Sequence, residues 1–492
     1  MASSAASVHP GDPGLVRNAL SLRNAVVMSV ATMAPAAAIF FNTIPQAGLV
    51  GAAIPLTYVI GFVITLLVAN QVALMAREMP GSGSFYTFVA RGLGARWGFL
   101  TGWLSLICYG IVAPFAFLAL SASLQADVLR WSGVNIAWEI WLLVAAVVVF
   151  GIVYLGIQQS LRVDMTFIAF EVGVCIALGL TVLVVLGGRG QLSSTPFTLQ
   201  LIPKGSNFFV GVVLAILSFV GFEAAATLGG ETRNPRKNIP RAVFGSAIVI
   251  GVFYLFMSYV AVSGYGPTKM VSFSTNAAPF DTIARHFWNG TGATFVDIAG
   301  IVSFYALAVA IVNGSSRIIY TMGREGLFPR WFGTTSTERR IPRNSIAVLG
   351  AVAVLLGLGL GYWQTPIVAY GFLGTLDTLA ILVVYGLVNF ACFWYFFSQK
   401  RTRFSVFRHA VIPAVATAAL IAVFVGNVYP VPPAPLNTPP WITIGWIFLG
   451  LVVFMVLTRR RPEAVAQAGH FFDGDGEDEP VQSQHLPVLE AG

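Results

Sequence analysis

An acidic residue inside a long apolar segment is the most informative feature of this sequence. The segment contains Phe219, Val220, Gly221, Phe222 and Glu223 and is otherwise apolar. A carboxylate at the centre of a membrane-spanning helix costs about 3 kcal/mol, and Gly221 weakens the helix beside it. A basic stretch with two prolines follows at 229–241. A broken helix that carries an acid is typical of a transporter's binding site at the membrane midplane.

The composition indicates a membrane protein. Of the 492 residues, 57% are hydrophobic and 10% are charged, whereas soluble proteins carry about 25% charged residues. The net charge of +8 does not indicate nucleic-acid binding, because the basic residues lie in short loops between apolar runs. Cys108, Cys175 and Cys392 lie in apolar segments, which argues against disulfides and thiolate metal sites. We expect no secretory signal peptide, because residues 1–22 lack a long apolar core.

The apolar runs predict the number of spans. A helix needs about 20 apolar residues to cross a bilayer. By this criterion the sequence predicts twelve spans, near 24–47, 51–75, 97–126, 139–158, 163–187, 207–229, 241–263, 293–321, 344–362, 366–397, 409–428 and 441–458. An even number places both termini on the same side of the membrane.

The basic residues predict the orientation. With the N-terminus in the cytoplasm, 23 of the 28 Lys and Arg residues lie in or beside cytoplasmic segments, as the positive-inside rule requires. The five on the other side are Arg130, Arg189, Lys204, Lys269 and Arg285. The acidic run at 473–479 has no periodicity, so a disordered cytoplasmic tail is expected there.

A second interruption, at Pro35, lies five spans before Gly221. Proline has no amide proton and clashes with the preceding helical turn, so it can break a helix. A simple kink is the alternative, because membrane helices tolerate proline. Interruptions at matching places in two halves of a chain indicate inverted repeats around a central site, which favours a true break.

Three stretches carry a family resemblance. The first begins Met79-Pro-Gly-Ser-Gly-Ser-Phe-Tyr and runs to residue 94, the second is Glu231-Thr-Arg-Asn-Pro-Arg-Lys-Asn-Ile-Pro-Arg-Ala, and the third begins Asn313-Gly-Ser-Ser-Arg-Ile-Ile-Tyr and runs to residue 329. In this order they resemble the loop after span two, the loop after span six and the end of span eight in amino acid–polyamine–organocation permeases. The resemblance covers roughly residues 24–460.

The resemblance implies an all-α membrane fold with about twelve transmembrane helices. Two five-helix inverted repeats would form a leucine-transporter-like core, with helices 1 and 6 broken and helices 11 and 12 outside it. The implied organisation is a cytoplasmic tail (1–22), a first repeat (23–190), a second repeat (191–398), helices 11 and 12 (399–459), and a disordered acidic cytoplasmic tail (460–492).

The resemblance also implies that backbone groups at the two breaks bind the substrate. Amide protons after Pro35 suit a carboxylate, and carbonyls freed near Gly221 suit an ammonium. Three alanines at 36–38 replace the Gly-Ser/Ala-Gly of the family pattern, so we expect a narrower pocket. The predicted substrate-binding residues are Ala34, Pro35, Ala36, Ala37, Ala38, Phe219, Val220, Gly221 and Phe222, with Tyr109 and Ser303 added for their depth and polarity.

Two buried acids are candidates for proton coupling. Glu171 lies nine residues after Arg162, where many proton-coupled members of the family carry a lysine. Burial would favour its neutral form, so Glu171 could carry a proton, and a neutral hydrogen-bonding role is the alternative. Glu223 could carry a proton or bind a cationic group, or it could cap the broken helix, which the family pattern favours.

Asp377 is the candidate for substrate selectivity. It lies inside a long apolar segment and could face the cavity and favour cationic ligands. Alternatively, it could bond to Thr375 or Thr378. Because these threonines offer local partners and proton uptake could neutralise the acid, we expect a neutral amino acid as substrate.

Three classes of function compete. Two separate breaks fit a channel or receptor poorly, and an enzyme would need a clustered catalytic set, whereas the five histidines lie in tails or near loops. We therefore expect a multi-pass plasma-membrane transporter that moves amino acids by proton-coupled symport. The alternatives are exchange and the import of cationic amines or polyamines.

We expect no cofactor, no metal and no nucleic acid. We also expect no heavy-chain subunit, because 127–138 lacks the cysteine that heteromeric relatives use.

Overall fold

The computed structural model describes residues 15 and 18–460, apart from 82, 204–207, 325, 327, 337, 430 and 433. The two predicted tails lie almost wholly outside these residues. In the described part of the chain, regular structure is helical and one isolated bridge pairs Leu20 with Thr232. The α-helices are α1 (Leu22–Met33), α2 (Pro35–Val50), α3 (Ile54–Glu78), α4 (Phe85–Leu93), α5 (Ala95–Gly110), α6 (Val112–Ser132), α7 (Trp138–Tyr154), α8 (Ile157–Gly188), α9 (Phe208–Phe219), α10 (Pro235–Tyr265), α11 (Met270–Thr275), α12 (Pro279–Phe287), α13 (Gly290–Arg324), α14 (Arg343–Trp363), α15 (Pro366–Ser398), α16 (Ile412–Val428) and α17 (Pro439–Arg460).

Ten helical stretches of the described chain are long and apolar enough to cross a membrane. The first, Leu22–Glu78, has 57 residues and contains two of the predicted spans. Helix α7 lies on another predicted span and is apolar but shorter. The predicted all-α membrane fold is thus confirmed, while the number of twelve spans and the inverted repeat stay predictions.

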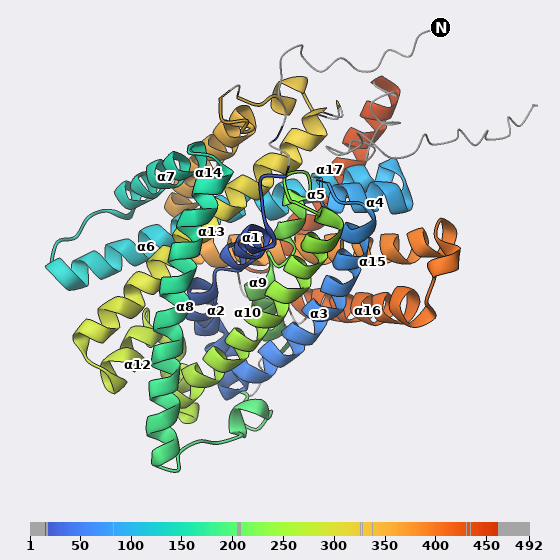
Figure 1. Cartoon of the computed structure of the whole chain (residues 1–492). Coiled ribbons are helices and arrows are strands. Elements are labelled where there is room, and N and C mark those ends of the chain that lie inside the picture. The colour runs from blue at the N-terminus through green and yellow to red at the C-terminus, as the bar shows by residue number, and fades with distance from the viewer. Residues whose placement is uncertain are drawn as a thin grey trace, which may run out of the picture.

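Helices α1 and α2 form the centre of the bundle. Helix α1 packs against α8, α10 and α13, and α2 packs against α9 and α13. In Figure 1, α1 lies in the middle of the molecule, while α16 and α17 lie toward one side, where they pack on α15. Segments far apart in the sequence therefore meet around α1.

Two helices end in the interior of this bundle. Helix α1 stops at Met33, Ala34 takes a left-handed conformation with φ 48°, and Pro35 begins α2. Helix α9 stops at Phe219, and a short 3-10 helix, η3 (Ala224–Leu228), follows. Between them Gly221 has φ 109°, which glycine adopts without the steric cost that a Cβ imposes.

A buried ion pair joins two of the sequence motifs. Arg317 of α13 and Glu231, in the loop after η3, are each 1% exposed. The Arg317 Nε lies 2.5 Å from Glu231 Oε2, and its Nη1 donates to the Asn313 carbonyl at 2.6 Å. The pair fixes the loop after η3 against α13.

Replacement of Glu231 by Ala should destabilise the fold, because it leaves a buried guanidinium without its partner. The expected loss is about 3–5 kcal/mol, measured as earlier loss of monodisperse protein on heating in detergent. Glu78→Ala is the control, since Glu78 pairs with the 68% exposed Arg403 and should cost about 1 kcal/mol or less. Adding Arg317→Met to Glu231→Ala should restore part of the stability. Equal melting of the Glu231 and Glu78 variants would contradict this interpretation.

Candidate functional site

The break between α1 and α2 exposes amide donors at the start of α2, and these donors are engaged. The Ala36 amide donates to Glu171 Oε2 at 3.0 Å, and the Ala37 amide donates to Ser303 Oγ at 3.0 Å. The Ala38 amide donates to the carbonyl one helical turn earlier at 2.8 Å. In this structure, the three donors that the sequence assigned to a substrate carboxylate thus have protein partners.

Glu171 reaches the break from α8. Its side chain is fully buried, and its second oxygen, Oε1, has no hydrogen-bond partner among the described residues. A carboxylate at a helix N-terminus is favoured by the free amides and by the helix dipole. Glu171 therefore takes the position that a substrate anion would need.

Glu223 occupies the break after α9. The Gly221 amide donates to its Oε2 at 3.1 Å, the Tyr109 hydroxyl donates to Oε1 at 2.8 Å, and the Tyr385 hydroxyl donates to Oε2 at 3.1 Å. This geometry corresponds to the capping role that the family pattern favours.

Two further side chains tie the breaks to each other. The Tyr254 hydroxyl of α10 lies 2.5 Å from the Met33 carbonyl and 2.8 Å from the Ser218 carbonyl. The Ser29 hydroxyl of α1 donates to the Phe222 carbonyl at 2.7 Å and accepts from an amide of η3. Sequence reasoning missed both, because neither a tyrosine nor a serine stands out in an apolar helix.

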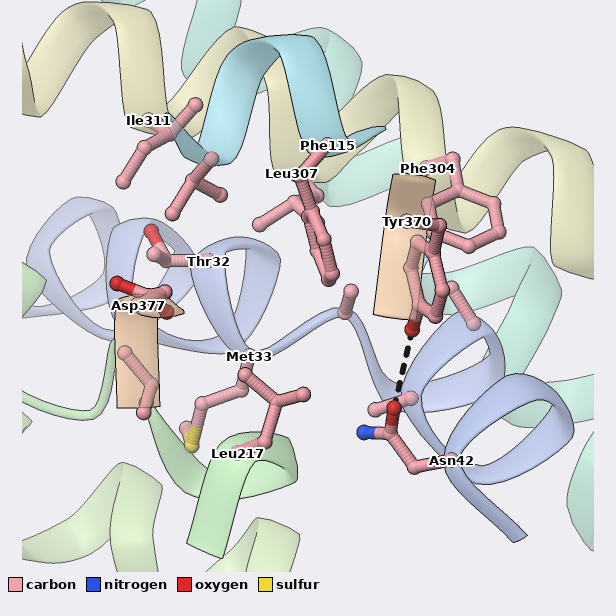
Figure 2. Close-up of a pocket in the computed structure, with 15 residues that line it drawn as sticks. Thr32, Met33, Asn42, Phe115, Leu217, Phe304, Leu307, Ile311, Tyr370 and Asp377 are labelled. Atoms are coloured by element: carbon pink, nitrogen blue, oxygen red, sulfur yellow. Dashed lines mark hydrogen bonds between the residues drawn. The ribbon is translucent and has the colours of Figure 1, made fainter. Parts of the chain in front are cut away.

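A small cavity lies beside the first break (Figure 2). Its volume is about 40 Å³, so the surrounding helices must move apart before a ligand as large as an amino acid can bind. The residues that line it are Thr32, Met33, Ala34, Ala37, Ala38, Asn42, Val112, Phe115, Leu217, Val220, Phe304, Leu307, Ile311, Tyr370 and Asp377.

Five of the predicted site residues line this cavity: Ala34, Ala37, Ala38, Val220 and Asp377. The other predicted substrate-binding residues do not. Phe219 packs against Phe62 and Tyr254, with ring centroids 5.9 and 5.2 Å away, and Phe222 packs against Tyr385.

The remaining predicted residues begin a helix or form hydrogen bonds within the protein. Pro35 begins α2 and Ala36 bonds to Glu171, while the hydroxyls of Tyr109 and Ser303 bond to Glu223 and to the amide of residue 37. The space beside Gly221 is filled by another helix, because a Cβ there would lie 2.5 Å from Thr32 Cγ2.

Polar and aromatic residues that the sequence analysis did not single out complete the wall. The Tyr370 hydroxyl donates to Asn42 Oδ1 at 3.0 Å, and the Phe115 ring stacks on Tyr370 at 4.3 Å. Asn42 could have been found as a polar residue in an apolar run. Phe115 and Phe304 gave no signal, because the chain has 38 phenylalanines.

Comparison with known proteins identifies the family of this chain. The family model described as amino acid permease matches residues 24–462. The chain belongs to the amino acid permease family. The resemblance drawn from the three loop motifs is thereby confirmed.

Relatives of this permease differ in what their names say they carry. The branched-chain amino acid permease BcaP of Lactococcus lactis subsp. cremoris is 24% identical over 82% of this chain and 87% of its own. The low-affinity putrescine importer PlaP of Escherichia coli is 28% identical over 69% of this chain and 74% of its own. The serine/threonine exchanger SteT of Bacillus subtilis is 24% identical over 73% and 80%.

Asp377 of the permease has no local partner. It is 3% exposed, lines the cavity, and its Oδ1 has no hydrogen-bond partner among the described residues. The hydroxyls of Thr375 and Thr378 donate instead to carbonyls of their own helix, at 2.9 and 2.8 Å. The predicted bonds from Asp377 to these threonines are therefore wrong, because intrahelical carbonyls lie closer to a threonine hydroxyl.

A second cavity of the permease, of about 190 Å³, lies between α2, α6, α12 and α13. Its charged wall centres on Arg130, which lies 2.6, 2.7 and 3.0 Å from carboxylate oxygens of Asp127, Asp281 and Asp297. Arg285 also pairs with Asp281, at 2.8 Å. This cluster ties α6, α12 and α13 together on the side that the sequence predicts to be outside.

Gly221→Ala should weaken substrate binding, because the new Cβ would collide with Thr32 and the left-handed backbone would be strained. We expect about a tenfold loss of affinity, measured by thermal shift with the amino acid that most stabilises the wild type. The added side chain would thus displace α1. Gly386→Ala is the control, since a Cβ there meets nothing within 4 Å. Wild-type affinity in Gly221→Ala would show that the α1 contact does not shape the site.

Proposed function

We propose that this permease is a secondary active transporter that moves amino acids across the plasma membrane by proton-coupled symport and alternating access. One observation carries the proposal. The Glu171 carboxylate accepts a hydrogen bond from the amide of Ala36 at the start of α2, where an amino acid carboxylate would bind. A protonatable group and the substrate thus compete for one position. The names of two relatives, a branched-chain amino acid permease and a serine/threonine exchanger, agree with amino acid transport.

The competition explains how proton and substrate are coupled. An ionised carboxylate forms charge-assisted hydrogen bonds that are about twice as strong as neutral ones. Protonation of Glu171 weakens its bond to the Ala36 amide and lets the substrate carboxylate replace it. When the proton leaves, the ionised side chain takes the amide back and expels the substrate.

Glu171 is a better proton carrier than Glu223 in this scheme. Three donors stabilise the ionised form of Glu223, and they also hold the break after α9. Glu171 Oε2 accepts from the Ala36 amide, and Oε1 has no hydrogen-bond partner among the described residues. Its protonation therefore breaks fewer hydrogen bonds.

Alternating access follows from the way the two breaks are joined. Tyr254 and Ser29 hold the end of α1 close to the break after α9, so the two broken helices move together against the rest of the bundle. In this proposal both termini face the cytoplasm, on the side of the arginine-rich loops. Exchange of substrates remains the alternative to symport.

Glu171→Gln should remove the coupling but keep the fold, because glutamine can still accept the Ala36 amide and cannot release a proton. In proteoliposomes the wild type should be stimulated by an inward proton gradient and not by sodium. In the variant, the stimulation by the proton gradient should be about tenfold smaller. Ser160→Ala is the control, since it removes a buried hydroxyl of α8 that bonds to backbone carbonyls but no titratable group, and it should keep the pH dependence. Sodium-dependent uptake at constant pH, or unchanged pH dependence in Glu171→Gln, would contradict the proposal.

Import of a cationic amine is the second candidate, and Asp377 favours it. An ionised carboxylate without a partner is expensive in a low-dielectric cavity, and a substrate ammonium would relieve that cost. The expectation of a neutral amino acid rested on neutralisation of Asp377 by a proton and on bonds to Thr375 and Thr378, and the structure does not provide these bonds. The name of the putrescine importer among the relatives agrees with this candidate.

Asp377→Asn separates the two candidates in a competition assay. If the substrate is cationic, lysine, arginine or diamines should lose affinity by about tenfold or more, while neutral amino acids should change little. Thr378→Val is the matched control, because its hydroxyl bonds within α15. An equal effect of Asp377→Asn on cationic and neutral ligands would rule out the amine candidate.

A further inference from the structure

A second acid on α8, Asp164, is buried without any partner. Its side chain is 0% exposed, and neither carboxylate oxygen has a hydrogen-bond partner among the described residues. Buried polar groups in folded proteins are almost always hydrogen-bonded. An acid that lacks every partner is therefore a candidate for binding a proton.

Asp164 lies on the same face of α8 as Glu171. The two are seven residues apart, which is close to two helical turns and a rise of about 10 Å. Asp164 is the nearer of the two to the start of α8 at Ile157, the end that the positive-inside rule places toward the cytoplasm. The two acids thus form a column that runs from the first break toward the inside.

The surroundings of Asp164 are apolar. Leu161 and Ile168, which lie about one turn before and after it on this face, belong to a cluster that joins α1, α8, η3 and α13. The other buried members of this cluster are Leu20, Val27, Met28, Ala31, Ile157, Ala224, Leu228, Ala306 and Ala310.

The charged groups on the neighbouring elements do not compensate Asp164. Glu171, a buried acid of the same helix, would carry a charge of the same sign and could not stabilise an ionised Asp164. Arg162 of α8 and Arg23 of α1 are exposed. Other charged or titratable groups on these elements have partners of their own. Arg317 of α13 binds Glu231, and Glu223 binds Tyr109 and Tyr385. Asp281 of α12 and Asp297 of α13 bind Arg130, and the hydroxyls of Tyr254 and Tyr259 on α10 bond to backbone carbonyls.

An ionised Asp164 would be very costly in this environment, because the acid is buried and has no hydrogen-bond partner among the described residues. We propose that Asp164 is a second proton-binding site, which accepts the proton that Glu171 releases and passes it to the cytoplasm. This inference rests on the proposed proton coupling. When α1 and α13 separate on the inner side, water reaches Asp164 and takes its proton.

The transfer then proceeds through water between the two acids. The O–H bond of Glu171 breaks, its proton moves along the water chain, and an O–H bond forms on the Asp164 carboxylate. Glu171, now ionised, takes the Ala36 amide again. One proton has left the substrate site for the cytoplasm, and Asp164 is neutral as before.

Asp164→Asn tests the proposal, because asparagine has nearly the same shape and cannot carry a proton. In wild-type proteoliposomes, initial uptake should rise as the internal pH is raised from about 6 to about 8. In the variant, this increase of initial uptake should be roughly tenfold smaller. Asp164→Glu should restore most of the increase. Ser160→Ala, which removes a buried hydroxyl of α8 bonded to the Ile152 and Gly156 carbonyls, should keep the response to internal pH. A wild-type response in Asp164→Asn would overturn the proposal.

Thermal stability in detergent gives a readout that does not depend on transport. Between about pH 6 and about pH 9, the melting temperature of the wild type should fall more than that of Asp164→Asn, because unfolding lets the buried acid ionise. Equal slopes would overturn the proton site. If wild-type uptake ignores internal pH while these slopes still differ, the proposed symport fails and the proton site stands.

Discussion

This structure depends on one constraint: backbone amides and carbonyls in an apolar medium need hydrogen-bond partners. Within a bilayer, a free amide or carbonyl cannot bond to water and costs several kcal/mol. Helices α1 and α9 nevertheless end in the interior of the bundle. Their ends persist because side chains supply the partners: Glu223 from within the break after α9, and Glu171, Ser303, Tyr254 and Ser29 from other helices.

The same constraint links structure to function. A substrate can bind at a broken helix only by replacing a group that already bonds there. In the proposed mechanism, the substrate replaces the carboxylate of Glu171 at the start of α2, and the strength of this carboxylate as an acceptor depends on its protonation. The proposal thus couples substrate binding and proton binding through one hydrogen-bonding position, without direct contact between proton and substrate.

The sequence predicted what depends on local backbone chemistry. Pro35 and Gly221 act on their own main chain, so the positions of the two breaks could be inferred, and the loop motifs indicated the family. The destinations of side chains could not be inferred, because they depend on how each helix is rotated in the bundle. Phe219 and Phe222 pack away from the cavity, and the Tyr254 link between the breaks needs contacts between segments more than 200 residues apart.

The number of protons exchanged when substrate binds to the purified permease tests the account most directly. It can be measured with a pH indicator in weakly buffered detergent solution. If the substrate carboxylate displaces an ionised Glu171 carboxylate, binding in alkaline solution should take up about one proton per amino acid, and Glu171→Gln should take up none. Binding without proton uptake in the wild type would contradict the account.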